Sequence, residues 1–211
     1  MDRNPTIVFQ RPGQVAVEDR EKPVPKEGEI LIQTRRTLIS TGTELTILTG
    51  DFPPHSAWAR YGKYPMVPGY DNIGVVVETG PNVSPDWLGK KVATQTKHAL
   101  FVTAPAAKAR LIHREISDDH AAFFTIAEIV MNGVRRGAVQ WGEAVVVYGQ
   151  GLLGQLTVRF WRLCGARPVF AADIADARLA RLPRDPAIVP VNPSREDIRT
   201  VVEKTTRGRM A

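Results

Sequence analysis

The stretch VVVYGQGLLGQL, residues 145–156, passes from an apolar run through three glycines into a second apolar stretch. The glycines are spaced G-x-G-x-x-G, a pattern that carries little weight alone because glycine is common. Here the pattern follows a run typical of a buried strand and begins a run typical of an amphipathic helix. The expected apolar positions of this helix are Leu153, Leu156, Phe160 and Leu163.

The glycine turn predicts a binding site for the diphosphate of a dinucleotide. A helix N-terminus offers unpaired N–H groups and a positive dipole end to an anion. Gly149 is expected to make the turn, Gly151 to let the backbone approach the diphosphate, and Gly154 to let helix and sheet pack closely. A second strand, PVFAAD, ends in Asp173, where a carboxylate binds the hydroxyls of an adenosine ribose. The predicted cofactor contacts are Gly149, Gln150, Gly151, Leu152, Leu153, Gly154, Asp173 and Arg178.

Asp173 favours NAD(H) over NADP(H), because a carboxylate repels a 2′-phosphate. Two alternatives stay open. Asp173 also suits the cap of a helix that starts near Ala175, a role compatible with ribose binding. Arg178 is placed either to face solvent or to hold a 2′-phosphate, which keeps NADP(H) as a second option.

The second half of the chain alternates predicted helices and strands. A helix over about 118–137, capped by Ser117 or Asp118, precedes the strand AVVVY. The alternation indicates a parallel sheet covered by helices, the first part of a Rossmann fold. The further predicted elements are helices over 151–164, 175–182 and 195–206, the last capped by Ser194, and the strands PVFAAD and AIVPV.

The first half reads as short strands separated by turns. TIVFQ and QVAVED flank Arg11-Pro12-Gly13-Gln14, where proline followed by glycine suits a type II turn and predicts a hairpin. Further strands are expected in GEILIQTRR, NIGVVVETG, KKVATQT and ALFVTAP. So many short strands indicate an all-β barrel or sandwich. We therefore predict two domains, residues 1–117 and 118–211.

The bulk composition argues against several classes of protein. The 211 residues carry a formal net charge of +6, but the basic residues are scattered, so nucleic-acid binding is not expected. No apolar run is long enough to cross a bilayer and the N-terminus does not resemble a signal peptide, which predicts a cytoplasmic protein without a membrane partner. The single cysteine, Cys164, is expected to be a buried helix residue and rules out an internal disulfide.

A strand-rich half followed by a Rossmann half resembles the medium-chain dehydrogenase/reductase family, whose first domain is a GroES-like barrel. The resemblance rests on ISTGTELTILTG at 39–50, YPMVPGYDNIGVVVETG at 64–80 and GEAVVVYGQGLLGQLTVRFWRLCGARPVFAAD at 142–173. It implies an oxidoreductase that uses NAD(P)(H). The first two phrases and the loop between them are most similar to the branch of bacteriochlorophyllide hydroxyethyl dehydrogenases, which implies a small-molecule substrate that is bulky.

Alcohol dehydrogenases of this family bind a catalytic zinc through a cysteine, a histidine and a further cysteine or glutamate. The corresponding positions here are Thr41, Tyr70 and approximately Thr125, and hydroxyls do not replace thiolate and imidazole ligands around zinc. The four-cysteine lobe that binds structural zinc in many relatives is missing as well. His55, His98, His113 and His120 are widely spaced and are expected at the surface or behind the residues of a site. No metal site is predicted.

Hydride transfer without a metal needs hydroxyl donors, and the predicted catalytic residues are Thr43 and Tyr70. Thr43 corresponds to a proton-relay hydroxyl of the zinc-containing relatives, and the Tyr70 phenol is suited to donate to a carbonyl. Each has a structural alternative, since Thr43 suits a helix cap and Tyr70 suits filling the volume that the metal vacates. Glu44 and Asp71 are expected to organise the cleft through hydrogen bonds. A loop at 51–64 is the expected substrate wall, through Phe52, Trp58, Tyr61 and Tyr64.

Members of this family are longer than this chain, whose predicted Rossmann half stops after its third strand and helix. We expect a fragment of a longer protein, in preference to a partner chain that supplies the rest or a natural truncation. The leading prediction is a zinc-free, NAD(P)(H)-dependent oxidoreductase of an alcohol, carbonyl, enone or quinone, homodimeric at full length. The alternative is a nonenzymatic nucleotide-binding or interaction protein derived from this family.

Overall fold

The computed structural model describes residues 3–113 and 115–209 of the chain. It consists of two compact units, Met1–Thr125 and Ile126–Ala211. The division falls later than the predicted boundary at 117/118. Ala121 and Ala122 account for the difference, because they pack with Ile73 and Ala93 in the core of the first unit.

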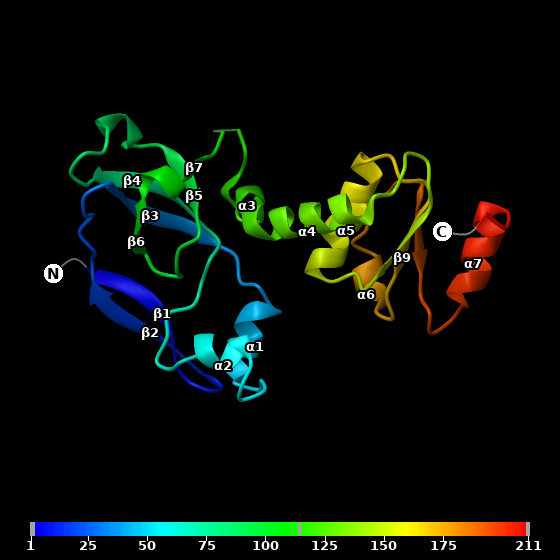
Figure 1. Ribbon diagram of the computed structural model, residues 1–211, viewed down its shortest axis with the longest axis horizontal. Helices are drawn as coiled ribbons and strands as arrows, with labels where there is room; N and C mark the ends of the chain where they lie inside the picture. The colour runs from blue at the N-terminus through cyan, green and yellow to red at the C-terminus, as the bar shows by residue number, and fades with distance from the viewer. Residues whose placement is uncertain (1–2, 114, 210–211) are drawn as a thin grey trace. The chain divides into compact units, whose positions relative to one another are not determined.

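Figure 1 shows the strands and helices along the chain. The strands are β1 (Arg3–Arg11), β2 (Gln14–Glu21), β3 (Glu29–Thr37), β4 (Asn72–Thr79), β5 (Lys91–Thr94), β6 (Phe101–Pro105), β7 (Arg110–Leu111), β8 (Val145–Tyr148), β9 (Val169–Ala172) and β10 (Ile188–Val191). The α-helices are α1 (Thr43–Thr49), α2 (Ala57–Tyr61), α3 (Asp118–Ala121), α4 (Phe124–Gly137), α5 (Leu152–Leu163), α6 (Asp176–Leu179) and α7 (Ile198–Thr206).

The first unit is built on an antiparallel sheet with the strand order β6-β3-β4-β5-β7. Alternating residues of these strands are apolar and fully buried, among them Ile30, Ile32, Val76 and Val92. Leu31, between Ile30 and Ile32, is fully buried as well, and Ile73 belongs to a second cluster, so parts of both faces of the sheet are covered. The strand-rich first domain expected from the sequence is therefore present in this unit.

The predicted hairpin is also present. β1 and β2 pair along their length, and Gly13 at their turn has a φ of +74°, a conformation that glycine adopts without steric cost. Two isolated bridges, Thr6 with Ala99 and Phe9 with Met66, join β1 to the segments beside the five-stranded sheet. The hairpin is therefore part of the first unit although it forms a separate sheet.

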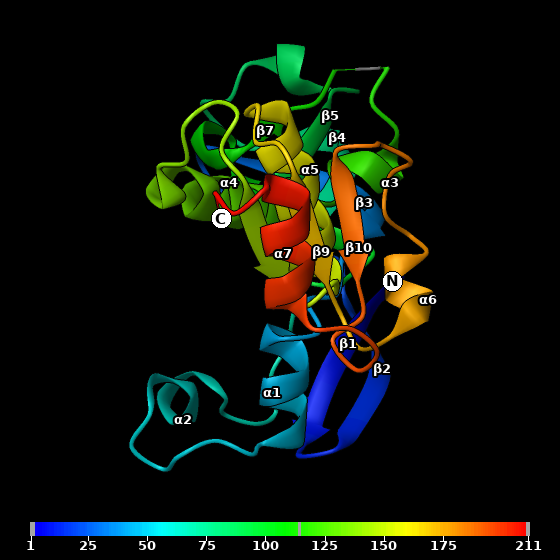
Figure 2. The same ribbon diagram turned by 90° about the vertical axis from the view of Figure 1, so that its right-hand side faces the viewer.

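The second unit is a three-stranded parallel sheet with the order β10-β9-β8. Figure 1 shows α5 and α7 on opposite faces of this sheet, and Figure 2, viewed from the side of α7, shows this helix in front of the strands. Val158 and Trp161 of α5 pack in one core and Val202 of α7 in another. The partial Rossmann sheet predicted from the alternating pattern is thus confirmed.

The apolar face predicted for α5 was wrong at both ends. Leu153 and Leu163 are exposed, whereas Val158 and Trp161 are buried. Gly154 explains the difference, because its close contact with the glycine turn directs the i, i+4 and i+7 positions 154, 158 and 161 toward the sheet. The predicted stripe lies beside this face.

The helix predicted over 118–137 is interrupted and forms α3 and α4. Ser117 caps α3 as expected, but the Thr125 N–H in the first turn of α4 donates to the distant Asp71 carboxylate. The predicted cap of α7 was also wrong. Asp197, rather than Ser194, accepts the N–H of Thr200, so α7 begins later than expected.

Two further expectations concern the burial of Cys164 and the length of the apolar helices. Cys164 is exposed at the end of α5 instead of buried, because the residues facing the sheet are those in register with Gly154. None of the helices within residues 3–113 and 115–209 combines the length and the apolar character that a bilayer crossing needs.

Candidate functional site

The glycine turn lies at the carboxyl end of β8, directly before α5. Gly149 has a φ of +79° and its N–H donates to the carbonyl of Ala172 in β9 over 2.8 Å. Gly151 is the N-cap of α5. The first N–H groups of a helix have no partner within the helix, so the turn presents the start of α5 at the edge where parallel sheets bind ligands.

Gly151 and Gly154 differ in what surrounds them. A Cβ added to Gly151 would have no heavy atom of the surrounding protein within 4 Å. A Cβ added to Gly154 would lie 1.8 Å from the carbonyl oxygen of Gly149. The space beside Gly151 is therefore open to an approaching ligand, whereas Gly154 is required for the backbone of α5 to contact the turn.

Asp173 follows β9 and lies against the glycine turn. Its Oδ2 accepts the N–H of Gln150 over 2.6 Å and its Oδ1 accepts the N–H of Ala175 over 2.7 Å. These two backbone bonds lower the pKa of Asp173 below its ordinary value, with a smaller contribution from Arg178. The carboxylate therefore contributes stability above the pKa of an unfolded aspartate, and this contribution is lost as the pH falls through the folded pKa.

Arg178 pairs with the same carboxylate instead of simply facing solvent. Its Nη1 is 3.4 Å from Asp173 Oδ2, and the arginine side chain is 58% exposed while that of Asp173 is 3% exposed. Beside this pair, Ile174 is 74% exposed. An exposed apolar side chain next to a buried carboxylate is a surface on which a planar base can lie.

Gln150 is committed to the turn itself. Its N–H is donated to Asp173, and its buried side chain donates to the carbonyl of Val147 over 2.9 Å. Because Gln150 is only 1% exposed, its predicted contact with a cofactor stays a prediction. The role that the geometry gives Gln150 is to hold the turn against Asp173.

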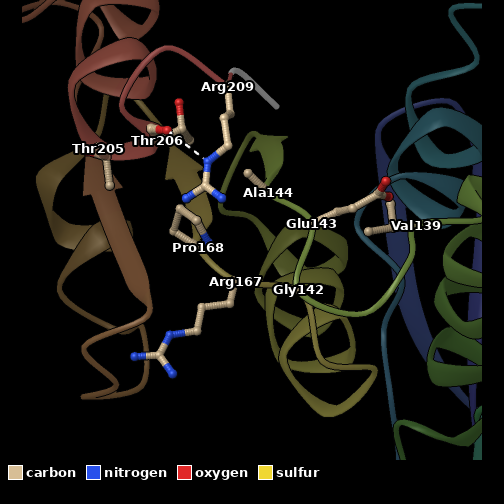
Figure 3. Close-up of a pocket in the computed structure, with 9 residues that line it drawn as sticks. All are labelled: Val139, Gly142, Glu143, Ala144, Arg167, Pro168, Thr205, Thr206 and Arg209. Carbon is tan, nitrogen blue, oxygen red and sulfur yellow. Dashed lines mark hydrogen bonds between the residues drawn. The ribbon is translucent and has the colours of Figure 1, made fainter.

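A cavity of about 490 Å³ lies at the opposite end of the sheet, where Ala144 precedes β8 and Pro168 precedes β9. In Figure 3, Arg209 extends over Pro168, whereas the guanidinium of Arg167 points away from it. The two cations do not converge on one point. Since parallel sheets bind ligands at the carboxyl ends of their strands, the glycine turn is the stronger candidate.

The predicted catalytic residues lie in the first unit. Thr43 is the first residue of α1, and Gly42 is its N-cap with no side-chain hydrogen bond. The structural alternative for Thr43, a capping role, was therefore wrong. Tyr70 is half-buried, and its carbonyl lies 3.5 Å from the Thr125 hydroxyl.

Their neighbours Glu44 and Asp71 belong to one buried cluster with His98. Glu44 Oε1 is 2.6 Å from His98 Nε2, and Glu44 Oε2 accepts the N–H of Ser40 over 2.6 Å. The expected organising role of the two acids is consistent with these bonds. His98 had no helical or metal-ligand spacing to reveal it, because its pairing with Glu44 bridges residues far apart in the chain.

The donor set does not fit zinc. Thr41 is exposed, Tyr70 and Thr125 offer only hydroxyls, and Thr125 is committed to Tyr70 and Asp71. Among residues 3–113 and 115–209, no three histidine, cysteine or acidic side chains are arranged to hold a metal ion. Hydroxyl groups are poor ligands for zinc at neutral pH, so we derive no chemical step through it.

The loop over 51–64 has two kinds of aromatic residue. Phe52 packs so closely on Gly62 that a Cβ there would lie 2.9 Å from its ring, and the Tyr64 hydroxyl donates to the carbonyl of Ile47. Trp58 is 37% and Tyr61 59% exposed. Phe52 and Tyr64 therefore hold the loop in place, and only Trp58 and Tyr61 are available to line a substrate site.

Comparison with known proteins agrees with both units. Residues 26–113 match the alcohol dehydrogenase GroES-like domain. The chain is 26% identical to 2-desacetyl-2-hydroxyethyl bacteriochlorophyllide A dehydrogenase of Cereibacter sphaeroides over 95% of its own length. It spans 66% of the length of that relative.

Two solved structures show the same fold. An alcohol dehydrogenase of Escherichia coli CFT073, complexed with NADH, superimposes with a TM-score of 0.82 at 22% identity and covers 97% of this chain and 66% of its own. A candidate zinc-binding dehydrogenase of Sinorhizobium meliloti 1021, bound to NADP, gives a TM-score of 0.79 at 21% identity and covers 96% and 65%. The fold accommodates either dinucleotide in those proteins.

Proposed function

Because the chain carries an alcohol dehydrogenase GroES-like domain and is related to the medium-chain dehydrogenases and reductases, we propose that it is the larger part of a nicotinamide-dependent oxidoreductase. The reaction class is hydride transfer to or from an alcohol, carbonyl, enone or quinone, without a catalytic zinc. The observation that carries the proposal is the glycine turn, open at Gly151 and held against the carboxylate of Asp173 over 2.6 Å.

The chain's own residues would bind the dinucleotide in three ways. The N–H groups at Gly151, Leu152 and Leu153 face the diphosphate at the start of α5. The Asp173 carboxylate would accept the ribose hydroxyls, and the exposed Ile174 side chain would offer an apolar contact to the adenine. The nicotinamide, when bound, supplies a site that accepts or releases a hydride.

We further propose that NAD(H) is preferred over NADP(H). A bound 2′-phosphate would approach the Asp173 carboxylate, which repels it. Arg178 moderates this repulsion, since its guanidinium is 3.4 Å from the same carboxylate and largely exposed. Asp173 keeps its bonds from the N–H groups of Gln150 and Ala175 without the arginine, so the exposed guanidinium is able to turn toward a phosphate.

Arg178→Ala is expected to weaken NADPH binding about tenfold more than NADH binding, a difference of about 1.4 kcal/mol. The reason is that the variant leaves Asp173 without its cation where the 2′-phosphate approaches. Fluorescence titration with both reduced dinucleotides measures the ratio. Arg135→Ala, which removes an exposed arginine from the last turn of α4, is the control of equal charge change and should leave the ratio unaltered. Equal losses for both dinucleotides would show that Arg178 does not sense the 2′-phosphate.

The substrate is proposed to be a bulky molecule that contacts Trp58 and Tyr61. These side chains are exposed on the loop that Phe52 and Tyr64 anchor. Thr43 and Tyr70 supply the hydroxyls that donate to or accept from the substrate oxygen. Both belong to segments whose neighbouring residues meet in the cluster of Glu44, Asp71 and His98.

Hydride transfer by the full-length protein is expected to survive prolonged dialysis against a zinc chelator. The reason is that Thr41, Tyr70 and Thr125 offer no thiolate, imidazole or carboxylate ligand. NADH appearance or consumption with secondary alcohols, ketones, enones and quinones is the assay, and a zinc-containing alcohol dehydrogenase treated in parallel is the control. Loss of activity on chelation with recovery on added zinc would contradict the zinc-free mechanism. Tight NADH binding without turnover of any of these classes would instead favour the nonenzymatic alternative.

A further inference from the structure

Three ionisable side chains from distant segments are buried together in the first unit. Glu44 on α1 is 2% exposed, Asp71 before β4 is 0% exposed and His98 between β5 and β6 is 7% exposed. Removing charged groups from water is costly unless they are paired or neutralised by a proton. A fold that keeps all three inside has therefore to control where their protons reside.

The hydrogen bonds of this cluster are incomplete in one place. His98 Nε2 and Glu44 Oε1 share a hydrogen bond over 2.6 Å, and Asp71 Oδ1 accepts the N–H of Thr125 over 3.2 Å. Within the parts of the chain that the structure describes, Asp71 Oδ2 and His98 Nδ1 are buried without a hydrogen-bond partner. A cluster with a purely structural role normally has all its buried polar atoms bonded.

The surroundings of Asp71 favour its protonated form. Burial raises the pKa of Asp71 above its ordinary value and the charge of Glu44 raises it further, while the bonds from Thr125 and the charge of His98 lower it. These groups, from α1, α4 and the β5–β6 connection, are the ones that act on this carboxyl. Their opposed effects leave Asp71 able to hold a proton that an exposed aspartate would release.

We propose that Asp71 holds the exchangeable proton of the metal-free site at its unpartnered Oδ2, with His98 and Glu44, bonded to each other, as positioning residues that control how firmly the proton is held. This inference rests on the proposed oxidoreductase function. In the reduction of a carbonyl, the proton of the Asp71 carboxyl would pass by way of the Thr43 or Tyr70 hydroxyl to the substrate oxygen and leave a carboxylate, while the dinucleotide would supply the hydride that forms the new C–H bond. In the oxidation of an alcohol, the substrate O–H proton would pass to the ionised Asp71, and the electron pair of the C–H bond would leave as hydride to the dinucleotide.

The assignment suits the chain connectivity. Thr43 is bonded to Glu44 and Tyr70 to Asp71, so the two residues predicted to touch the substrate are next to members of the cluster. Ser40 ties the same cluster to the segment before α1 through the second Glu44 oxygen. The two hydroxyls and the buried acids are therefore carried by the same two short segments of the chain.

Infrared titration of protein labelled at its aspartate carboxyl carbons tests the proton store without requiring activity. We expect a protonated carboxyl band that is lost in Asp71→Asn. Glu44→Gln should move its titration about one pH unit lower and His98→Gln about one unit higher, because these variants remove opposite influences on Asp71. Asp119→Asn, which removes an exposed carboxylate paired with Arg36, should leave the band in place. If His98→Gln unfolds, the smaller His98→Asn makes the same comparison.

A carboxyl band that stays unmoved in both Glu44→Gln and His98→Gln would overturn the inference. The kinetic arm uses the full-length protein. His98→Gln should lower kcat about 100-fold and shift its pH profile in the same direction as the infrared band, with KM for the dinucleotide unchanged. A kcat that falls by the same factor at every pH would show that His98 has only a structural role. Absence of any dinucleotide-dependent turnover in the wild type would instead overturn the proposed function, while the infrared result would still decide the proton store.

Discussion

Gly151→Ala is expected to leave the protein folded but to weaken NADH binding about 100-fold, or about 3 kcal/mol. The added methyl meets nothing within 4 Å, and the φ of Gly151 is −74°, which alanine adopts freely. The methyl would stand where a diphosphate approaches the first N–H groups of α5. Holding the diphosphate away from these donors costs at least two charge-assisted hydrogen bonds.

The measurement is NADH fluorescence enhancement, accompanied by a thermal melt to establish folding. Gly133→Ala is the matched control, because Gly133 lies in α4 and a Cβ there also meets nothing within 4 Å. It should bind NADH as the wild type does. Wild-type affinity in a folded Gly151→Ala variant would show that the dinucleotide does not lie against this turn, and the proposed function would lose its main support.

Gly154→Ala, unlike Gly151→Ala, should disturb the fold itself. We expect it to destabilise the second unit by about 3 kcal/mol or more, at the upper end of the cost of overpacking. Its methyl would lie 1.8 Å from the carbonyl oxygen of Gly149 and 2.9 Å from the carbonyl carbon. Neither atom is at the end of a flexible side chain, so relief requires α5 to move away from the turn. That movement would also disturb the packing of Val158 and Trp161, which share the face of Gly154.

Thermal denaturation is expected to show a fall of more than about 10 °C for the transition of this unit, given roughly 4 °C or more per kcal/mol in a small domain. Hydrogen exchange should place the lost protection in α5 and β8. Gly133→Ala is again the control and should raise stability slightly, because alanine is the better helix former. A Gly154→Ala variant as stable as the wild type would mean that α5 and the turn are not in the contact described.

The glycine turn and the two sheet types could be predicted from local sequence. A turn with positive φ at Gly149 and an acid at the end of the next strand depend on residues close together in the chain, and period-two alternation marks the strands of the first unit. The face of α5 could not be predicted in this way. Val158 and Trp161 became the buried residues because Gly154 contacts Gly149, and hydrophobicity alone does not report such a backbone contact.

The candidate site was predictable to different extents in the two units. Asp173 lies where the pattern put it, against Gln150, but its pairing with Arg178 and its burial were not in the pattern. In the first unit, Thr43 and Tyr70 were singled out by resemblance, whereas His98 was expected either at the surface or behind the residues of a site. Its contact with Glu44 joins residues far apart in sequence, and only folding brings them within 2.6 Å.

The sequence by itself determined the order of the elements, the glycine turn at 149–154 and the acid that follows the next strand, because each of these depends on the conformational preferences of residues near one another in the chain. The tertiary structure alone decided that the Asp71 carboxylate accepts an N–H from the first turn of α4 and that Val158 and Trp161 of α5 face the sheet. It also decided that Glu44, Asp71 and His98 share one buried cluster. Burial and hydrogen bonding between distant segments set these features, and neither is expressed in the spacing of residues along the chain.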